Sequence, residues 1–202
     1  MPPRRRLDPA ERRAELLDAG ALLFAAKPYE EVFMEDIAEQ AGISRALLYR
    51  YFPNKRDLFA AIYQQAADRL LAEAEFDPAV SVPELVSAAL DAHIDYFAAN
   101  RNTVLAANQV LAGDRVIQAI IDDECATLQR RLLEVTGLEG RTRETVSALL
   151  MSWLVFVRTL CVDWLANQAF SRAELREMCV GALLGGLGAV VDPGRFPAPA
   201  GE

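Results

Sequence analysis

The sequence predicts an all-α protein, with a small N-terminal three-helix unit over residues 1–59 and a larger helical unit over residues 60–202. Apolar residues recur at helical spacing along nearly the whole chain, and no segment shows the alternation of a half-buried strand. Proline and glycine stand between these periodic segments rather than inside them, as expected at element boundaries. A chain of 202 residues can also bury a substantial core.

Four helices are expected in the first part of the chain. Asp8 can cap the first, because it precedes Pro9 and proline is favoured at the first helical position. Asn54, which follows Pro53, can cap the fourth in the same way. The expected ranges are 9–26, 34–41, 44–52 and 55–75.

Longer helices are expected in the rest of the chain. Two of them open with a capping-box pattern, Ser81 with Glu84 and Ser171 with Glu174. Gly137 marks the end of a third. The expected ranges are 81–100, 102–111, 114–136, 142–168 and 171–191.

The composition is that of a folded globular protein, with 52% hydrophobic and 25% charged residues. No apolar run reaches the roughly 20 residues that span a membrane, so we expect no membrane partner. The N-terminus lacks the apolar segment of a secretory signal, which favours a cytoplasmic location.

Charge is unevenly distributed along the chain. The first 59 residues carry as many basic as acidic side chains, so the net charge of −8 falls entirely on residues 60–202. A bound polyanion is therefore expected at the N-terminal end, and the acidic remainder would discourage unspecific coating of DNA.

Metal and cofactor chemistry has little support in the sequence. Cys125, Cys161 and Cys179 are far apart without metal-ligand spacing, and His93 is the only histidine. We expect buried, reduced thiols, with redox sensing as the alternative. The chain also lacks a nucleophile motif, a phosphate loop or paired catalytic carboxylates. We therefore expect no metal, no cofactor and no catalytic site.

The segment "DIAEQAGISRALLYRYFPNKRDLF", residues 36–59, has the spacing of a helix-turn-helix. Such a motif needs a small residue where the two helices cross and a glycine in the sharp turn between them. The second helix needs a capping residue at its start and two apolar anchors one turn apart on its inner side. The residues in these positions are, in that order, Ala38, Gly42, Ser44, Leu48 and Phe52.

This arrangement leaves Arg45, Ala46, Tyr49 and Arg50 facing outward, as in a recognition helix that enters the major groove. Arg45 can bond N7 and O6 of guanine. Tyr49, Tyr51 and Lys55 can donate to phosphates. Taken singly, each aromatic residue is typical of a core and each basic residue of a solvated face. Together they favour a DNA-reading surface.

The chain resembles the TetR/AcrR transcriptional regulators over about residues 10–60. The residues that carry the resemblance are "MEDIAEQAGISRALLYRYFPNKRDLF" and the end of the preceding helix, "ALLFAAKPYEEV". The resemblance implies an N-terminal DNA-binding domain, a divergent ligand-binding and dimerisation domain, and repression relieved by a small molecule. By motif position, Arg45, Ala46 and Leu47 would face bases, and Tyr49, Tyr51 and Lys55 would hold phosphates. The basic arm over residues 1–8 would lie along the minor groove, or else serve as a solubilising terminus.

Three positions depart from the family pattern. Pro28 stands where a glycine is common, and Phe33 replaces the Ser or Thr that often caps the second helix and contacts phosphate. Leu47 replaces a small or polar residue, which suggests apolar contact with a thymine methyl group.

Sites in the larger unit are predicted from residue type alone. Gly181, Gly185 and Gly188 recur at helical spacing and suit a close helix contact, either in a homodimer or within the chain. Arg158 could receive an anionic ligand or pair with Asp163 or another acid. The full set of ligand candidates is His93, Tyr96, Asn100, Asn108, Gln109, Trp153, Phe156, Arg158 and Trp164.

The sequence thus predicts a dimeric repressor that binds a double-stranded operator and is released by a small hydrophobic or amphipathic effector. The alternative is a DNA-binding scaffold or nucleoid protein without a ligand, which would share the same N-terminal three-helix head, residues 1–59. Whether the protein represses or activates depends on where its operator lies.

Overall fold

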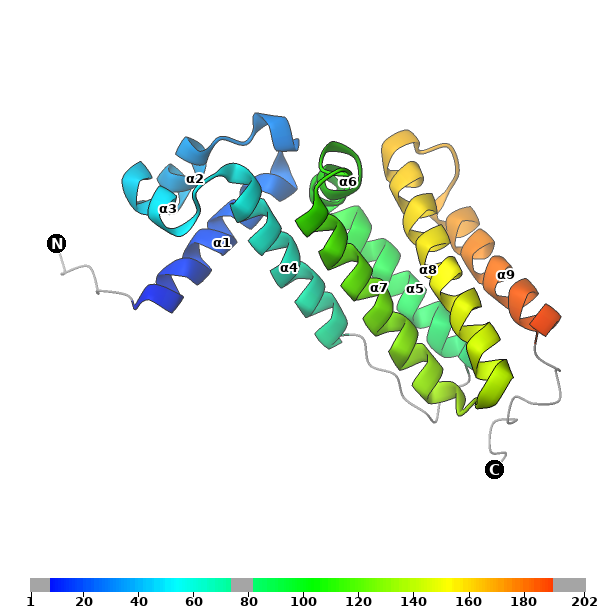
Figure 1. The fold of residues 1–202 in the computed structure, drawn as a ribbon. Coiled ribbons are helices and arrows are strands. Elements are labelled where there is room, and N and C mark those ends of the chain that lie inside the picture. Colours follow the sequence, from blue (N-terminus) through cyan, green and yellow to red (C-terminus); the bar gives the residue numbers. More distant parts are fainter. Residues whose placement is uncertain (1–7, 74–81, 191–202) are drawn as a thin grey trace, which may run out of the picture. The chain divides into compact units, whose positions relative to one another are not determined.

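The computed structural model describes residues 8–73 and 82–190, and within these ranges it contains helices and no strand (Figure 1). The all-α prediction is confirmed. The elements are α1 (Pro9–Ala26), a 3₁₀ turn η1 (Tyr29–Glu31), α2 (Met34–Gln40), α3 (Arg45–Tyr51), α4 (Lys55–Glu73), α5 (Val82–Ala99), α6 (Arg101–Leu105), a π-helical segment η2 (Ala106–Val110), α7 (Arg115–Thr136), α8 (Gly140–Asn167) and α9 (Arg172–Val190).

The chain forms two compact units. The first contains Met1–Ala66 together with Asn100–Ile117, and the second contains Ala67–Ala99 together with Gln118–Glu202. The first unit therefore holds the predicted three-helix head and also α6 and η2, which follow α5 in sequence. A functional boundary at residue 60 stays a prediction.

The predicted helix caps are present wherever the structure describes them. At α1, Glu11 N donates to Asp8 Oδ1 over 2.8 Å and Asp8 N donates to Glu11 Oε2 over 3.0 Å, which completes a capping box. Asn54 Oδ1 accepts from Asp57 N, and Ser171 and Glu174 exchange the same reciprocal bonds before α9. The predicted cap at Ser81 lies outside the described residues.

An aromatic cluster holds the core of the first unit. Phe24 and Phe59 pack edge to face with ring centroids 5.0 Å apart, and Tyr29 lies 5.3 Å from Phe59. Gly20 allows α1 to approach α4 closely, because a Cβ at this position would lie 2.7 Å from Ile62 Cδ1. The rings of Phe24, Tyr29 and Phe59 thus form a closely packed aromatic platform between α1, η1 and α4.

In the second unit, α8 and α9 make the most extensive contact of the described helix pairs. Gly186 faces α8, since a Cβ at this position would meet Leu149 Cδ1 at 2.7 Å. Trp153 Nε1 donates to the carbonyl of Cys179 over 2.7 Å. Burial raises the pKa of Cys161 to about 12 and that of Cys179 to about 11, so both thiols stay protonated and unreactive at neutral pH.

Within residues 8–73 and 82–190, α8 is the one helix that is long and apolar enough to cross a membrane. The segment α6–η2 and helix α7, which meet at a sharp bend, would add a second candidate if the pair were counted as one span. A core helix passes the same test. The buried residues of α8 recur at helical spacing, from Val146 through Leu150, Trp153 and Val157 to Leu165, which is the pattern of a core helix.

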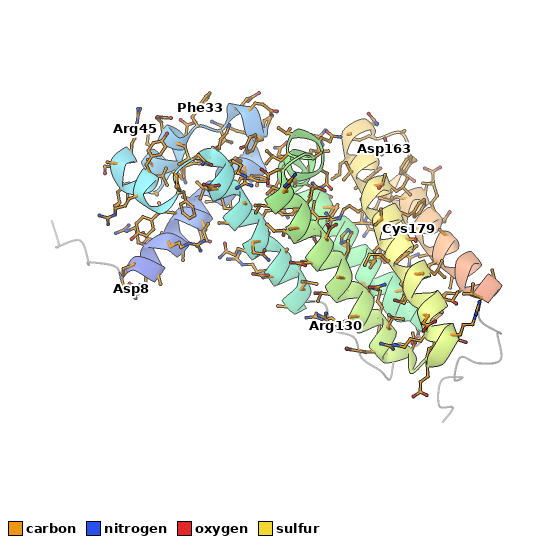
Figure 2. All side chains as sticks on the ribbon, in the orientation of Figure 1. Asp8, Phe33, Arg45, Arg130, Asp163 and Cys179 are labelled. Atoms are coloured by element: carbon orange, nitrogen blue, oxygen red, sulfur yellow. The ribbon has the colours of Figure 1, made fainter. Side chains whose placement is uncertain are left out.

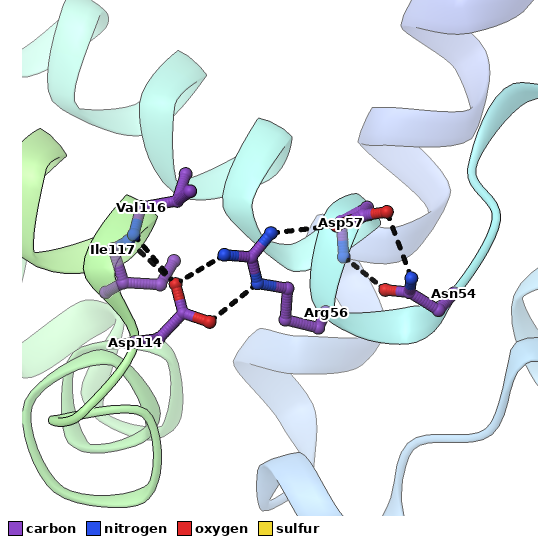
Figure 3. A network of polar contacts seen from close by, with 6 residues as sticks. All are labelled: Asn54, Arg56, Asp57, Asp114, Val116 and Ile117. Carbon is purple, nitrogen blue, oxygen red and sulfur yellow. Dashed lines mark hydrogen bonds and ion pairs between the residues drawn. The ribbon is translucent and has the colours of Figure 1, made fainter.

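An ion pair joins the first turn of α4 to the start of α7 within the first unit (Figure 3). Arg56 contacts both carboxylate oxygens of Asp114, with Nε–Oδ2 2.6 Å and Nη2–Oδ1 2.7 Å. Asp114 Oδ1 also accepts from the backbone N–H groups of Val116 and Ile117, so it caps α7. Such a bidentate contact fixes geometry as well as charge.

The Arg56 bond and these backbone bonds lower the pKa of Asp114 from 3.8 to about 2. Because the folded pKa lies below the unfolded one, the charge contributes stability above pH 3.8 that is lost as the pH falls toward 2. We expect Asp114→Asn, which keeps the capping oxygen, to melt below the native protein at pH 6 and to match it near pH 2. Thermal melts across that range check this, and a pH-independent difference would contradict it.

Candidate functional site

The turn between α2 and α3 has the geometry of a helix-turn-helix. Gly42 has φ +61°, a conformation that side chains disfavour. Its N–H donates to the carbonyl of Glu39 over 2.9 Å, and the N–H of Ile43 donates to that of Ala38 over 2.9 Å. Ala38 is 2% exposed, so the two helices cross at a small side chain. The turn and the crossing are therefore where the sequence predicts them.

The second helix of this motif is anchored on one side. Ser44 Oγ accepts from the N–H of Leu47 over 3.3 Å and caps α3, as predicted. Leu48 is fully buried and Phe52 is 4% exposed, so both apolar anchors lie in the core. Arg13 also covers the ring of Phe52, with Cζ 5.3 Å from its centroid.

The opposite side of α3 is open to solvent. Arg45, Ala46, Tyr49 and Arg50 are exposed, and Leu47 and Tyr51 are half-buried. The Arg45 side chain is 68% exposed and is labelled with its surroundings in Figure 2. A short helix that presents a long basic side chain at its leading end has the form needed for base edges in the major groove. The individual DNA contacts stay predictions.

Arg45 has a protein partner on the preceding helix. Its Nη1 lies 3.2 Å from Glu35 Oε1, and both side chains are exposed. An exposed ion pair of this kind contributes little free energy. Arg45 can therefore exchange the carboxylate for guanine at small cost.

Lys55 has a structural role that sequence reasoning missed. Its Nζ donates to the carbonyls of Tyr29 and Val32 over 2.8 and 3.0 Å, and lies 4.3 Å from the centroid of the Tyr29 ring. Burial lowers its pKa. An ammonium has three donors, so the predicted phosphate bond would use the third. The same side chain ties the start of α4 to the η1 segment.

Phe33 occupies the position before α2 that often holds a capping hydroxyl. The structure shows no side-chain hydrogen bond at this N-cap, and Phe33 is 58% exposed (Figure 2). The departure noted in the sequence thus replaces a capping hydroxyl with an exposed aromatic ring.

The ligand candidates divide between the two units. Asn108, Gln109 and Asn100 belong to the first unit, and Asn108 Nδ2 donates to the carbonyl of Val104 over 2.8 Å. His93, Tyr96, Trp153, Phe156, Arg158 and Trp164 belong to the second.

The ligand candidates of the second unit have different surroundings. The indole N–H groups of Trp153 and Trp164 donate to backbone carbonyls, which is a structural role, and Phe156 is 40% exposed. Arg158 pairs with an acid, as one of the sequence alternatives held, but the acid is Glu124 rather than Asp163. Asp163 instead accepts from Asn167 Nδ2 over 2.7 Å.

Glu124 was missed in the sequence, although a signal for it exists. It follows Ile117, Ile120 and Ile121 at the spacing of the buried face of α7. A charged residue that is fully buried almost always has a partner. Glu124 is 4% exposed, and its partner Arg158 lies on α8.

The glycines of α9 face in different directions. A Cβ at Gly181, Gly185 or Gly188 would meet nothing within 4 Å, whereas one at Gly186 would meet α8. The three predicted interface glycines therefore pack against no side chain or backbone of the described residues. Large apolar side chains exposed on the same two helices are Val155, Phe156, Met178, Leu184 and Val190.

We expect Gly42→Ala to lower the free energy of unfolding by about 1 kcal/mol, because an alanine is strained at positive φ. Gly113→Ala is the matched control, since its Cβ would meet nothing within 4 Å and its φ is not in the left-handed region. Urea denaturation of the two variants measures the difference. Equal midpoints would show that the turn does not depend on glycine.

Comparison with known proteins agrees with this geometry. The model for bacterial regulatory proteins of the tetR family matches residues 16–62, which run from α1 into α4. The HTH-type transcriptional activator FasR of Mycolicibacterium smegmatis is 38% identical over 66 residues, 33% of this chain and 30% of that protein. The HTH-type transcriptional regulator RutR of Escherichia coli is 30% identical over 130 residues, 58% of this chain and 60% of that protein. The chain thus spans less than two thirds of either curated relative.

Solved structures share the fold over most of the chain. A tetR-family transcriptional regulator from Streptomyces coelicolor superposes with a TM-score of 0.81 at 22% identity, over 94% of this chain and 86% of that one. The transcriptional regulator FadR of Bacillus subtilis, in complex with stearoyl-CoA, gives 0.60 at 18% identity over 86% and 98%. The helix-turn-helix residues and the family match over them lead to one conclusion: residues 16–62 are a DNA-binding region of the TetR family of bacterial regulatory proteins.

Proposed function

We propose that the protein is a homodimeric transcriptional repressor that reads its operator with α3 and releases it when a small hydrophobic or amphipathic molecule binds the second unit. The observation that carries this proposal is the two-sided character of α3. Leu48 and Phe52 are buried, while Arg45, Ala46 and Tyr49 are exposed on a helix capped at its leading end by Ser44.

Recognition of DNA would combine two kinds of contact. Arg45 reads guanine through a pair of hydrogen bonds, and Ala46 and Leu47 contact thymine methyl groups. Tyr49, Tyr51 and the remaining donor of Lys55 hold phosphates and fix the register of the helix. The negative charge of residues 60–202 weakens unspecific binding, so the recognition contacts decide where the protein stays.

A twofold assembly fits this mode of reading, because half-sites about one helical turn apart match two recognition helices. The proposed partner face is formed by Gly181, Gly185 and Gly188 on α9 with the exposed apolar side chains of α8 and α9. The open space above these glycines supports close approach of a second copy.

Control by a small molecule is supported by the character of the second unit. Its helices bury an apolar core that contains a few polar side chains, a setting suited to an amphipathic ligand. The fold neighbour from Bacillus subtilis was crystallised with stearoyl-CoA. Effector binding would shift the population toward a conformation in which the two recognition helices no longer fit successive grooves.

Fluorescence anisotropy tests DNA reading on the duplex upstream of the protein's own coding region, with a scrambled duplex for comparison. We expect at least hundredfold preference for the native duplex. Arg45→Ala should weaken native binding about tenfold or more, because a bidentate Arg–guanine contact is worth about 1–3 kcal/mol.

Arg130→Ala on α7 is the matched control, since it removes the same charge from an exposed position in the second unit. It should change either affinity by less than about twofold. Equal, weak binding to both duplexes at this operator, unaffected by Arg45→Ala, would contradict sequence reading by α3. A scaffold without a ligand would bind DNA but show no release with any effector.

The dimer face is tested by Gly185→Leu, whose side chain would point into open space in a single chain. We expect a folded protein whose sedimentation mass shifts from dimer toward monomer. Gly113→Leu, which also meets nothing within 4 Å but lies in the first unit, should remain dimeric. An unchanged dimer mass for Gly185→Leu would remove α9 from the interface.

A further inference from the structure

A buried polar cluster lies inside the second unit, where α5, α7 and α8 converge. Arg158 Nη2 on α8 donates to Glu124 Oε2 on α7 over 2.6 Å. Glu124 is 4% exposed and Arg158 is 8% exposed. On α5, the rings of His93 and Phe97 lie tilted against one another with centroids 4.0 Å apart, and Arg158 Cζ lies 5.5 Å from the centroid of Phe97. Glu124, Arg158 and the half-buried His93, whose Nε2 atom is buried, are called the buried cluster below.

A buried ion pair is poor evidence of a stabilising role. Taking both charges out of water costs free energy that their attraction often does not recover. A well-packed apolar pair of the same volume is therefore often as stabilising as the ion pair, or more so. Arg158 lies over the ring of Phe97, which is 2% exposed, and Cys125, next to Glu124 in the chain, is 6% exposed. Stability alone therefore does not account for charged residues in this place.

Glu124 Oε1 and His93 Nε2 are buried, and neither has a hydrogen-bond partner among the residues that the structure describes. Glu124 uses its other oxygen for Arg158, so Oε1 is an acceptor that no described residue satisfies. Buried polar groups are nearly always paired, so these two atoms point to a partner beyond the described residues.

The charge of the cluster limits what that partner can be. Arg158 and Glu124 compensate one another. Burial, with the nearby Arg158, lowers the pKa of His93 to about 3, so its imidazole is neutral at physiological pH. A ligand with an anionic head group would be repelled by the carboxylate of Glu124, and one with a cationic head group would be repelled by the guanidinium of Arg158. An uncharged head group meets neither repulsion.

We propose that the buried cluster anchors the effector, and that the effector carries an uncharged head with a hydrogen-bond donor beside an acceptor, as in a primary amide, on an apolar body. The donor bonds Glu124 Oε1, and the acceptor takes the N–H of His93 in the Nε2 tautomer. The apolar body packs against Phe97 and its neighbours. This inference rests on the proposed function and names the chemical class of its effector.

The first test compares decanamide with decanoate on the native protein by isothermal titration and by release of DNA in the anisotropy assay. We expect decanamide to bind at least tenfold more tightly than decanoate and to release the operator at lower concentration. Equal or tighter binding of decanoate, or no binding of decanamide, would overturn the inference. This comparison needs no variant.

The second test separates a ligand anchor from a structural ion pair. The double variant Glu124→Leu/Arg158→Met replaces both charges with apolar side chains, a change that buried pairs often tolerate. We expect it to melt at or above the native temperature and to keep its DNA affinity, while its affinity for decanamide falls at least tenfold. Native-like decanamide binding by this variant would contradict the inference.

Asp91→Leu/Arg176→Met is the control, because it removes partly exposed ion pairs of α5 with α9 in the same unit, the 3.0 Å pair of Asp91 with Arg176 and the 3.1 Å pair of Asp91 with Arg172. It should bind decanamide like the native protein, and a loss equal to that of the cluster variant would also count against the inference. Failure of the proposed function looks different. A native protein without operator preference would disprove DNA reading, whereas operator binding that ignores decanamide would disprove only the anchor.

Discussion

The crossing of α2 and α3 is the constraint on which the DNA-reading surface depends. The crossing is close because Ala38 is small, and the turn is sharp because Gly42 adopts a positive φ. Together they direct Leu48 and Phe52 into the core and leave Arg45 and its neighbours outside. A larger residue at the crossing or a strained turn would rotate α3 and bury a different face.

The head also shows how one side chain can combine two duties. Lys55 was predicted from its sequence position as a phosphate contact, yet its ammonium holds the carbonyls of Tyr29 and Val32. A phosphate bound at its remaining donor would therefore be fixed relative to the platform of Phe24 and Phe59. Rigid placement of a backbone contact is what lets a short helix read bases in register.

The sequence predicted the head more completely than the second unit, for a physical reason. Caps, turn glycines and apolar periodicity are local signals, so α1, α3 and the Gly42 turn could be placed within a residue or two. The pairing of Arg158 with Glu124 joins residues 34 apart on different helices, and residue type alone could not choose Glu124 over Asp163. Similarly, only the packing separates Gly186, which faces α8, from Gly185, which faces open space. The π-helical turn at Ala106–Val110 had no signal that sequence periodicity could reveal.

Selection of duplexes from a randomised pool by the purified protein would test most directly whether α3 reads sequence as part of a twofold assembly. The account predicts enrichment of a palindromic site whose half-sites lie about one helical turn apart, with guanine at a fixed position in each half. A pool that gains no sequence preference over successive rounds, while the protein still retains DNA, would contradict it.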